Sequence, residues 1–297
     1  MQVGVDFMIA LEPFRTVIFA LFLVANPPPR DQMINIGSHK LHIHRMGTGA
    51  PVVVIDVGIA TQVESWEGFA GHIAAETSVC TYDRAGYGQS DPGPMPRDVG
   101  RLAEELNALL HGASVPGPYI LVGHSLGALT MQVYAAKYPA DVAGILLLDP
   151  PPLSWLLGRS YPDLRAMADQ MTAEWQKTAE TAGRSSSPQD QARAAFFRTI
   201  ASEHSEVFGR SAKLVADITS FGDIPLVVIA SGKPNPAFGK VAEEYQKYWA
   251  DQSRALAQKS SNGRFVFAPD SSHDLHIDAA DVVIEAIRTL ISKARVP

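Results

Sequence analysis

The segment from residue 119 to residue 137 places the tightest constraint on how this chain can fold. An apolar run, YILV at 119–122, leads into GHSLG at 123–127, and a helical pattern covers 126–137. Glycines on both sides of the central serine predict a turn too tight for side chains at those two positions. Such a turn lifts the hydroxyl of Ser125 above the end of a strand, beside the N-terminus of a helix. We therefore predict a strand–turn–helix unit with Ser125 at its apex.

The rest of the chain alternates strand and helix patterns in the same way. Continuous apolar or β-branched runs predict buried strands, and amphipathic runs predict helices. The predicted strands are 34–36, 40–45, 51–56, 79–82, 119–122, 144–148, 225–229 and 264–268, and the predicted helices are 99–110, 126–137 and 281–292. This alternation predicts an α/β fold in which a mostly parallel, doubly wound sheet has helices on both faces.

Residues 151–221 break the alternation. They contain no strand pattern, and their helical segments are 161–182, 187–204 and 207–220. We predict that they form a helical cap, inserted into a core made of residues 31–150 and 222–297. Ligands of such sheets bind beyond the carboxyl ends of the strands, where this insertion emerges. The alternative is a set of extra helices packed on the side of the sheet.

Residues 1–30 form a third predicted part, an apolar helix or anchor. The run at 16–25 is apolar throughout, but its ten residues are too few for a membrane span of about 20. It fits the apolar part of an export signal, although Asp6 and Glu12 stand where basic residues are usual. A retained helix that contacts a second copy in a homodimer, or a membrane, is the alternative. The sequence therefore leaves open whether the protein is cytoplasmic, membrane-associated or exported.

Composition argues against several classes of function. The net charge is −6 and no segment is rich in lysine and arginine, so we expect no nucleic-acid binding. The single cysteine, Cys80, cannot form a disulfide within the chain, and we expect it to be buried as a small apolar residue. Since no motif for a metal, a phosphate or a dinucleotide is present, we expect neither a cofactor nor a metal.

Motifs around the serine turn resemble those of the α/β-hydrolase superfamily. Residues 82–90 read YDRAGYGQS, similar to that superfamily's Y-D-x-x-G-x-G-x-S segment, and SSH at 271–273 is similar to the segment that carries its catalytic histidine. The resemblance covers residues 34–150 and 222–292. It implies an α/β-hydrolase fold and a serine nucleophile at Ser125. The reaction we expect is hydrolysis of carboxylic esters of short-to-medium acyl or aryl type.

The resemblance also implies which histidine acts as the base. A serine hydroxyl is a weak nucleophile at neutral pH and needs a base beside it. His273 follows the last predicted strand by five residues and precedes the last helix, where the superfamily has its catalytic histidine. His276 is the alternative base. His39, His42 and His44 lie in the first predicted hairpin, and we expect them to be surface residues.

Asp149 is the expected acid of the triad. It directly follows the strand at 144–148, whereas the commoner position, after the strand at 225–229, offers no carboxylate before Glu243. The order Ser125, Asp149, His273 matches the order of nucleophile, acid and base in the superfamily. An aspartate at a strand end can also simply cap a loop, which is the alternative role.

The expected oxyanion donors are backbone N–H groups of Leu126 and Ile59. Leu126 directly follows the nucleophile, and Ile59 lies in the VGI segment after the strand at 51–56, where the superfamily often has His-Gly-x. Such donors must meet the negative charge that develops on the former carbonyl oxygen. For the substrate pocket we expect contributions from His124, Trp155 and Leu156, with packing as the alternative role of His124.

Other reactions on the same fold stay open at this stage. The sequence does not separate an esterase from a lactonase, a thioesterase, a C–C bond hydrolase or a cofactor-free perhydrolase. Relatives that use an aspartate nucleophile are excluded because the turn carries Ser125. A non-catalytic ligand receptor is a further alternative of a different class.

Overall fold

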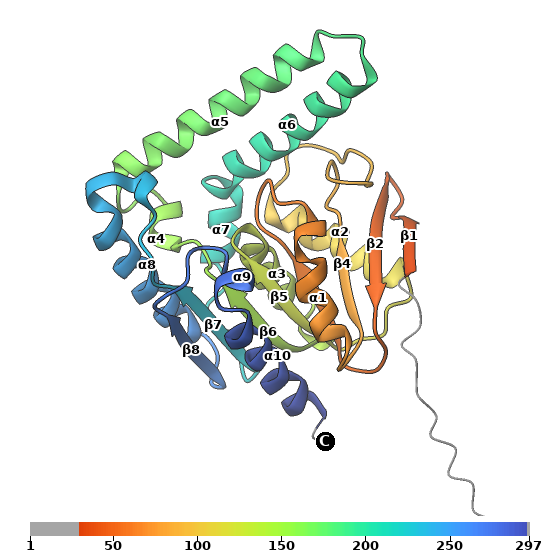
Figure 1. The fold of residues 1–297 in the computed structure, drawn as a ribbon, viewed down its shortest axis with the longest axis vertical. Helices are drawn as coiled ribbons and strands as arrows, with labels where there is room; N and C mark the ends of the chain where they lie inside the picture. The colour runs from red at the N-terminus through yellow and green to blue at the C-terminus, as the bar shows by residue number, and fades with distance from the viewer. Residues whose placement is uncertain (1–29, 296–297) are drawn as a thin grey trace, which may run out of the picture.

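The structure, a computed structural model, describes residues 30–295. At its centre lies an eight-stranded sheet of order β1-β2-β4-β3-β5-β6-β7-β8 (Figure 1). β2 pairs antiparallel with both of its neighbours, and the strands from β4 through to β8 pair in parallel. This is the mostly parallel α/β sheet that the sequence predicts.

The strands follow the predicted runs, with differences at their ends. The central strands are buried along almost their whole length because helices cover both faces of the sheet. The bounds are β1 Arg30–Asn35, β2 Lys40–Met46, β3 Val52–Asp56, β4 Val79–Tyr82, β5 Tyr119–His124, β6 Val142–Leu148, β7 Leu226–Ser231 and β8 Gly263–Ala268. Ser231 thereby becomes the last residue of β7, two positions beyond the predicted end at Ile229.

Two layers of helices enclose the sheet. On one face α1 (Glu67–Ala74) and α10 (Ala280–Arg295) bury apolar side chains against it. On the other face lie α2 (Val99–Gly112), α3 (Leu126–Lys137) and α8 (Ala242–Ala257). Outside the segment between β6 and β7, the short helical turns are η1 Val63–Trp66, η2 Pro139–Asp141, η3 Pro236–Val241 and α9 Leu275–Asp278. Cys80 is buried in the core, as predicted.

The helices between β6 and β7 divide into two groups. α5 (Pro162–Gly183) and α6 (Pro188–Val207) pack against each other as a hairpin that projects beyond the sheet (Figure 1). The short α4 (Leu153–Leu156) and α7 (Arg210–Ala216) instead pack on the core, α7 directly against α2 and α3. The term cap is used below for the α5–α6 hairpin alone.

The prediction of surface positions for the hairpin histidines is wrong for two of them. His39 and His42 are buried, and His44 is half-buried. The loop after β4 covers this part of β2: Asp83 Oδ2 lies 3.0 Å from His42 Nδ1, and the backbone N–H of Asp91 donates to the carbonyl of Lys40. A strand pattern alone carries no information about a loop that folds over it.

The predicted N-terminal helix or anchor, residues 1–30, lies outside the described residues except for Arg30, with which β1 begins. Within residues 30–295, no helix has both the length and the apolar character needed to cross a lipid bilayer.

Candidate active site

Ser125 occupies a strained turn between β5 and α3. Its φ of 54° and ψ of −115° lie outside the regions that residues other than glycine usually adopt, and such strain costs on the order of 1–3 kcal/mol. The turn is held from the neighbouring strand, because the N–H of Ser125 donates a 3.0 Å hydrogen bond to the carbonyl of Leu148. The hydroxyl therefore stands at the carboxyl edge of the sheet, at the N-terminus of α3.

Two glycines make this turn sterically possible. A side chain at Gly123 would bring Cβ to 2.5 Å from the carbonyl oxygen of Gly127, and one at Gly127 would collide with the carbonyl oxygen of Asp56. Real Cβ atoms do not approach backbone this closely. The close packing at Gly127 also brings the end of β3 against the start of α3. The glycine spacing in the sequence therefore reports the turn geometry directly.

Asp149 and His273 meet on the same edge of the sheet. Asp149 directly follows β6, and its Oδ2 lies 2.7 Å from His273 Nδ1. His273 is presented by the loop between β8 and α9, where the N–H groups of Gly232 and Lys233 both donate to the carbonyl of Ser271. The contact expected from the sequence is present, while the catalytic role of each residue stays a prediction.

Ser231 holds the Asp149 carboxylate from the end of β7. The Ser231 N–H donates to Oδ1 at 2.9 Å, and the Ser231 hydroxyl donates to Oδ2 at 2.8 Å. Gln246, on α8, donates to the carbonyl and the hydroxyl of Ser231 at 2.8 and 3.0 Å. The carboxylate is almost fully buried, and these hydrogen bonds compensate for its lost hydration. The sequence analysis did not identify Ser231 or Gln246 as part of the site. Only the observed length of β7 brings Ser231 to this position, and Gln246 reaches the site through Ser231.

His273 has a buried hydrogen-bond partner, Asp149, while its own ring is partly exposed. Burial lowers the pKa of His273, but the hydrogen bond and the charge of Asp149 outweigh it, so the pKa stands above its ordinary value. The His273 side chain keeps 43% of its surface exposed, which leaves it accessible to a substrate. A histidine held at Nδ1 by a carboxylate presents Nε2 as the proton acceptor.

His124 connects the serine turn to the histidine loop. Its Nε2 lies 2.9 Å from the carbonyl oxygen of His273, and the two ring centroids are 4.5 Å apart. Burial lowers the pKa of His124 well below its ordinary value, and the neighbouring His273 adds to the effect. Because a carbonyl oxygen can only accept, Nε2 of His124 carries a proton and donates to it. Because Ser125 is the next residue, this contact brings serine and histidine loop together.

His276, the alternative base, lies in a different environment. It is buried, and its ring stacks on Trp66 with centroids 3.8 Å apart and planes 9° from parallel. Within residues 30–295 neither ring nitrogen has a hydrogen-bond partner. Burial lowers its pKa. The geometry thus favours a packing role for His276 and leaves His273 as the candidate base.

The loop of residues 57–60, here called the oxyanion loop, lies against the serine. A Cβ built on Gly58 would stand 3.4 Å from Cβ of Ser125. Among residues 30–295, none accepts a hydrogen bond from the N–H of Ile59 or of Leu126. Leu126 is the first residue of α3, whose N–H has no partner within the helix. The role of both N–H groups as oxyanion donors stays a prediction.

Comparison with known proteins identifies the family. The model described as "Alpha/beta hydrolase family" matches residues 43–286. The protein named "Uncharacterized protein YqjL", from Bacillus subtilis, is 28% identical over 82% of this chain and 85% of its own length. Lipase LipV from Mycobacterium tuberculosis is 33% identical over 37% of this chain and 41% of its own length. A solved thermophilic esterase from Thermogutta terrifontis has a TM-score of 0.66 at 18% identity, covering 89% of this chain and 99% of that one. This chain belongs to the alpha/beta hydrolase family.

Membership makes the chain a hydrolase, and the fold is that of esterases and lipases in the family. At 18% identity the structural likeness shows a shared fold and leaves the substrate open. Within residues 30–295, no three His, Cys, Asp or Glu side chains are grouped so that they could hold a metal ion.

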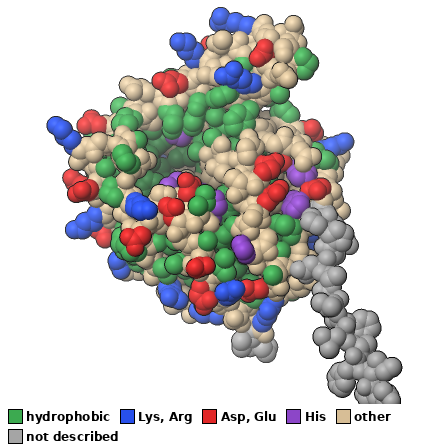
Figure 2. Space-filling view, viewed as in Figure 1, with side chains coloured by type: hydrophobic (Ala, Val, Ile, Leu, Met, Phe, Trp, Pro, Cys, Tyr) green, Lys and Arg blue, Asp and Glu red, His purple; other side chains and the backbone are tan. Residues whose placement is uncertain are grey.

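The surface is hollowed below the cap. Figure 2 shows a hollow there that is lined mainly by hydrophobic side chains, with histidine at its floor. Trp155 is half-buried, with its ring 5.0 Å from that of Phe208 and 5.7 Å from that of Tyr245. Its expected contact with the substrate stays a prediction.

Two other expected pocket residues, Leu156 and His124, are buried. Leu156 is fully buried in the apolar core on the α3 side of the sheet, so its side chain has no surface left for a substrate. His124 is buried as well, with its Nε2 engaged by the carbonyl of His273, which favours the packing alternative. The apolar pattern at the start of the insertion could not distinguish core contacts from pocket contacts.

Proposed function

We propose that this alpha/beta hydrolase cleaves carboxylic esters of short-to-medium acyl or aryl type through an acyl-enzyme on Ser125. The observation that carries the proposal is the 2.7 Å contact between Asp149 and His273 beside a serine held at positive φ. A nucleophile, a base and a carboxylate that orients the base are the three parts that acyl transfer requires.

The reaction has two balanced halves. In the first half, His273 Nε2 takes the proton of the Ser125 hydroxyl as its oxygen attacks the ester carbonyl carbon. The bond to the alcohol oxygen breaks, and His273 returns the proton to the departing alcohol. In the second half, water gives a proton to His273 and its oxygen attacks the carbonyl carbon of the acyl-serine. The bond to Ser125 Oγ breaks, and His273 returns the proton to that oxygen, which releases the carboxylic acid and restores both Ser125 and His273.

Negative charge develops on the carbonyl oxygen in both halves. The N–H groups of Leu126 and Ile59 stabilise it, and losing one such donor costs about 10²–10³ in kcat. The imidazolium formed on His273 is stabilised by the buried Asp149 carboxylate. The apolar hollow under the cap supports a substrate with an apolar acyl or aryl group of modest size. Each methylene of that group buried in the hollow would add roughly 1–3 kcal/mol of selectivity.

The test combines turnover with covalent labelling. The purified protein is given p-nitrophenyl acetate, butyrate, octanoate and palmitate, and is labelled separately with a fluorophosphonate. We expect turnover that is highest for the shorter acyl chains, labelling at Ser125, and loss of both in Ser125→Ala. Absence of labelling in the folded wild type would overturn the proposal. Labelling with turnover only of lactones, thioesters or C–C substrates would keep the serine mechanism and overturn the ester assignment.

A further inference from the structure

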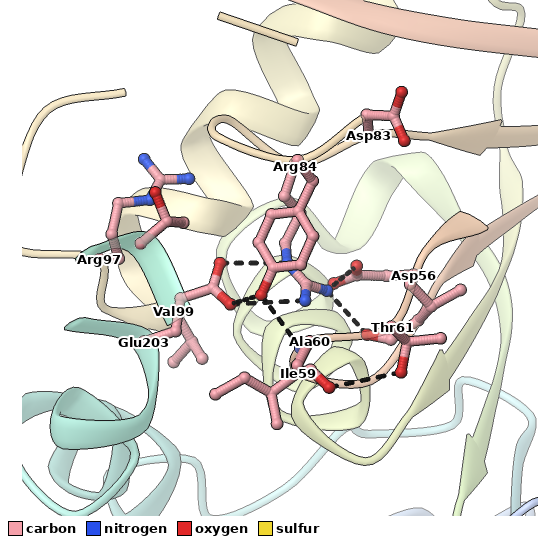
Figure 3. A network of polar contacts seen from close by, with 12 residues as sticks. Asp56, Ile59, Ala60, Thr61, Asp83, Arg84, Arg97, Val99 and Glu203 are labelled. Carbon is pink, nitrogen blue, oxygen red and sulfur yellow. Dashed lines mark hydrogen bonds and ion pairs between the residues drawn. The ribbon is translucent and has the colours of Figure 1, made fainter. Parts of the chain in front are cut away.

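We propose that Arg84, Tyr87 and Glu203 form a positioning relay that holds the conformation of the oxyanion loop. Because Glu203 lies on cap helix α6, the relay makes that conformation depend on the position of α6. The proposal rests on the function above, since it concerns how the Ile59 N–H is aimed. All three side chains are buried, and they join the segment after β4 to the loop after β3 and to the cap. Figure 3 shows Arg84 between the oxyanion loop and Glu203. None of them contacts Ser125 or His273 in the hydrogen bonds of the described chain.

Arg84 holds two successive carbonyl groups of the oxyanion loop. Its Nη1 donates to the carbonyl of Val57 at 2.7 Å, and its Nη2 donates to the carbonyl of Gly58 at 2.8 Å. The carbonyl of Gly58 and the N–H of Ile59 belong to one planar peptide unit and point in opposite directions. Anchoring this carbonyl on Arg84 therefore fixes the direction of the Ile59 N–H.

The positive charge of Arg84 also strengthens the donor. A charge-assisted hydrogen bond to a carbonyl polarises the whole peptide unit, so its N–H becomes a better donor in a site of low dielectric. Donors fixed before the reaction need no reorientation when the oxyanion forms. Arg84 is thus placed to set both the direction and the strength of the Ile59 N–H without touching the substrate.

Glu203 connects this arrangement to the cap. It lies on α6 and is fully buried, with Oε1 3.2 Å from Arg84 Nε and Oε2 2.5 Å from the hydroxyl of Tyr87. The Tyr87 hydroxyl in turn accepts a hydrogen bond from the N–H of Ala60 at 3.2 Å. Glu203 therefore reaches both sides of the Ile59 position, through Arg84 on one side and through Tyr87 on the other.

Asp56 is a second buried carboxylate bound to Arg84. Its Oδ1 lies 2.7 Å from Nη1, and Asp56 is also buried at the end of β3. With this bond the guanidinium stays anchored to the core when Glu203 is removed. A displaced α6 would therefore leave Arg84 paired but free to tilt about Asp56. The relay makes the geometry of the oxyanion loop depend on the position of the cap helix.

The deciding variant is Glu203→Gln, which keeps the shape of the side chain and removes its charge. The matched control is Glu105→Gln, because Glu105 binds Arg97 in a buried bidentate pair at 2.7 and 2.8 Å and makes no hydrogen bond to residues 57–60 in the described chain. Tyr87→Phe deletes only the hydroxyl between Glu203 and Ala60. It serves as a second variant if Glu203→Gln folds poorly.

Two measurements distinguish positioning from a structural role. The first is kcat and KM for p-nitrophenyl butyrate per titrated active site, together with inhibition by phenylboronic acid, a mimic of the tetrahedral state. For Glu203→Gln we expect kcat to fall about 10- to 100-fold with KM nearly unchanged, and boronate affinity to weaken by a similar factor. For Tyr87→Phe we expect a fall of up to about tenfold, and for Glu105→Gln no change per active site.

The second measurement does not depend on turnover. In ¹⁵N–¹H spectra, the Ile59 and Ala60 signals should shift in Glu203→Gln and Tyr87→Phe and stay in place in Glu105→Gln. If these signals stay in place, or if kcat falls equally in both glutamate variants, the relay is wrong. If the signals respond while the wild type shows no ester turnover, the relay stands and the proposed function fails.

Discussion

Asp149 Oδ2 lies 2.7 Å from His273 Nδ1, although 124 positions separate the two residues in the sequence. The sheet explains the meeting, because β6 delivers Asp149 and β8 leads into the loop of His273 at the same edge. β7 lies between them, and its last residue, Ser231, supports the carboxylate from the side. The order of the strands thus converts a distant pair in sequence into a direct contact.

The first prediction concerns Asp149→Asn. The amide keeps the shape of the side chain but can neither hold the correct tautomer of His273 nor stabilise its imidazolium. We expect kcat to fall about 10⁴-fold with the fold intact. The measurement is steady-state turnover of p-nitrophenyl butyrate, with circular dichroism to check folding.

The control for this change is Asp274→Asn. Asp274 is exposed, and its charge raises the pKa of His273 without a hydrogen bond to the ring. Its removal should change kcat by no more than about twofold, because exposed charges are screened by solvent. Equal losses in the two variants would contradict a specific role for Asp149.

The second prediction is the pH dependence of the reaction. His273 must be neutral to accept the proton of Ser125, and its pKa stands above the ordinary value of about 6.5. Activity should therefore be low in acid and rise with pH, with a midpoint above about 6.5. In Asp149→Asn the burial of His273 persists without the charge that opposes it, so the midpoint should move to lower pH. Profiles of kcat/KM from pH 4.5 to 9 check both shifts, and a variant profile with the wild-type midpoint would contradict the assignment.

The third prediction concerns Ser231→Ala. The variant removes the hydroxyl that donates to Asp149 Oδ2 and leaves the backbone N–H bond to Oδ1 in place. Losing one hydrogen bond to a charged group should lower kcat about tenfold, equivalent to about 1.4 kcal/mol. The control is Ser253→Ala on α8, whose buried hydroxyl has no partner within residues 30–295. A Ser231→Ala enzyme as active as the control would show that the carboxylate needs no support from β7.

The sequence was sufficient for the features that depend on local pattern. Glycine spacing indicates the turn at Ser125, and apolar runs indicate the strands that deliver it and Asp149 to one edge. The partners that support the site were missed because they depend on how distant segments pack. Glu203 is 119 positions from Arg84, on a helix whose sequence gives no sign of a buried charge. The burial of His42 likewise depends on a loop that folds over its strand.

The last prediction concerns the acid stability of the cap. His204, on α6, is buried, and its Nδ1 lies 2.6 Å from the Thr172 hydroxyl on α5. The ring packs against Trp175 and Phe208. Burial lowers the pKa of His204 to about 4, with Asp169 raising it and Arg165 lowering it by smaller amounts. The folded hairpin therefore holds this histidine neutral.

The sign of the pH effect follows from this pKa. As the pH falls below about 6.5, the unfolded chain binds a proton at His204 that the folded chain does not bind until about pH 4. The contribution of neutral His204 to the free energy of unfolding of the hairpin is therefore fully present above pH 6.5. It is lost progressively down to pH 4, by about 3 kcal/mol in the limit. Hydrogen exchange of α5 and α6, corrected for intrinsic rates, should speed up between pH 7 and pH 5. His204→Phe should remove most of that dependence, whereas the exposed His72→Gln should keep it. Equal pH dependence in wild type and His204→Phe would show that another group destabilises the hairpin in acid.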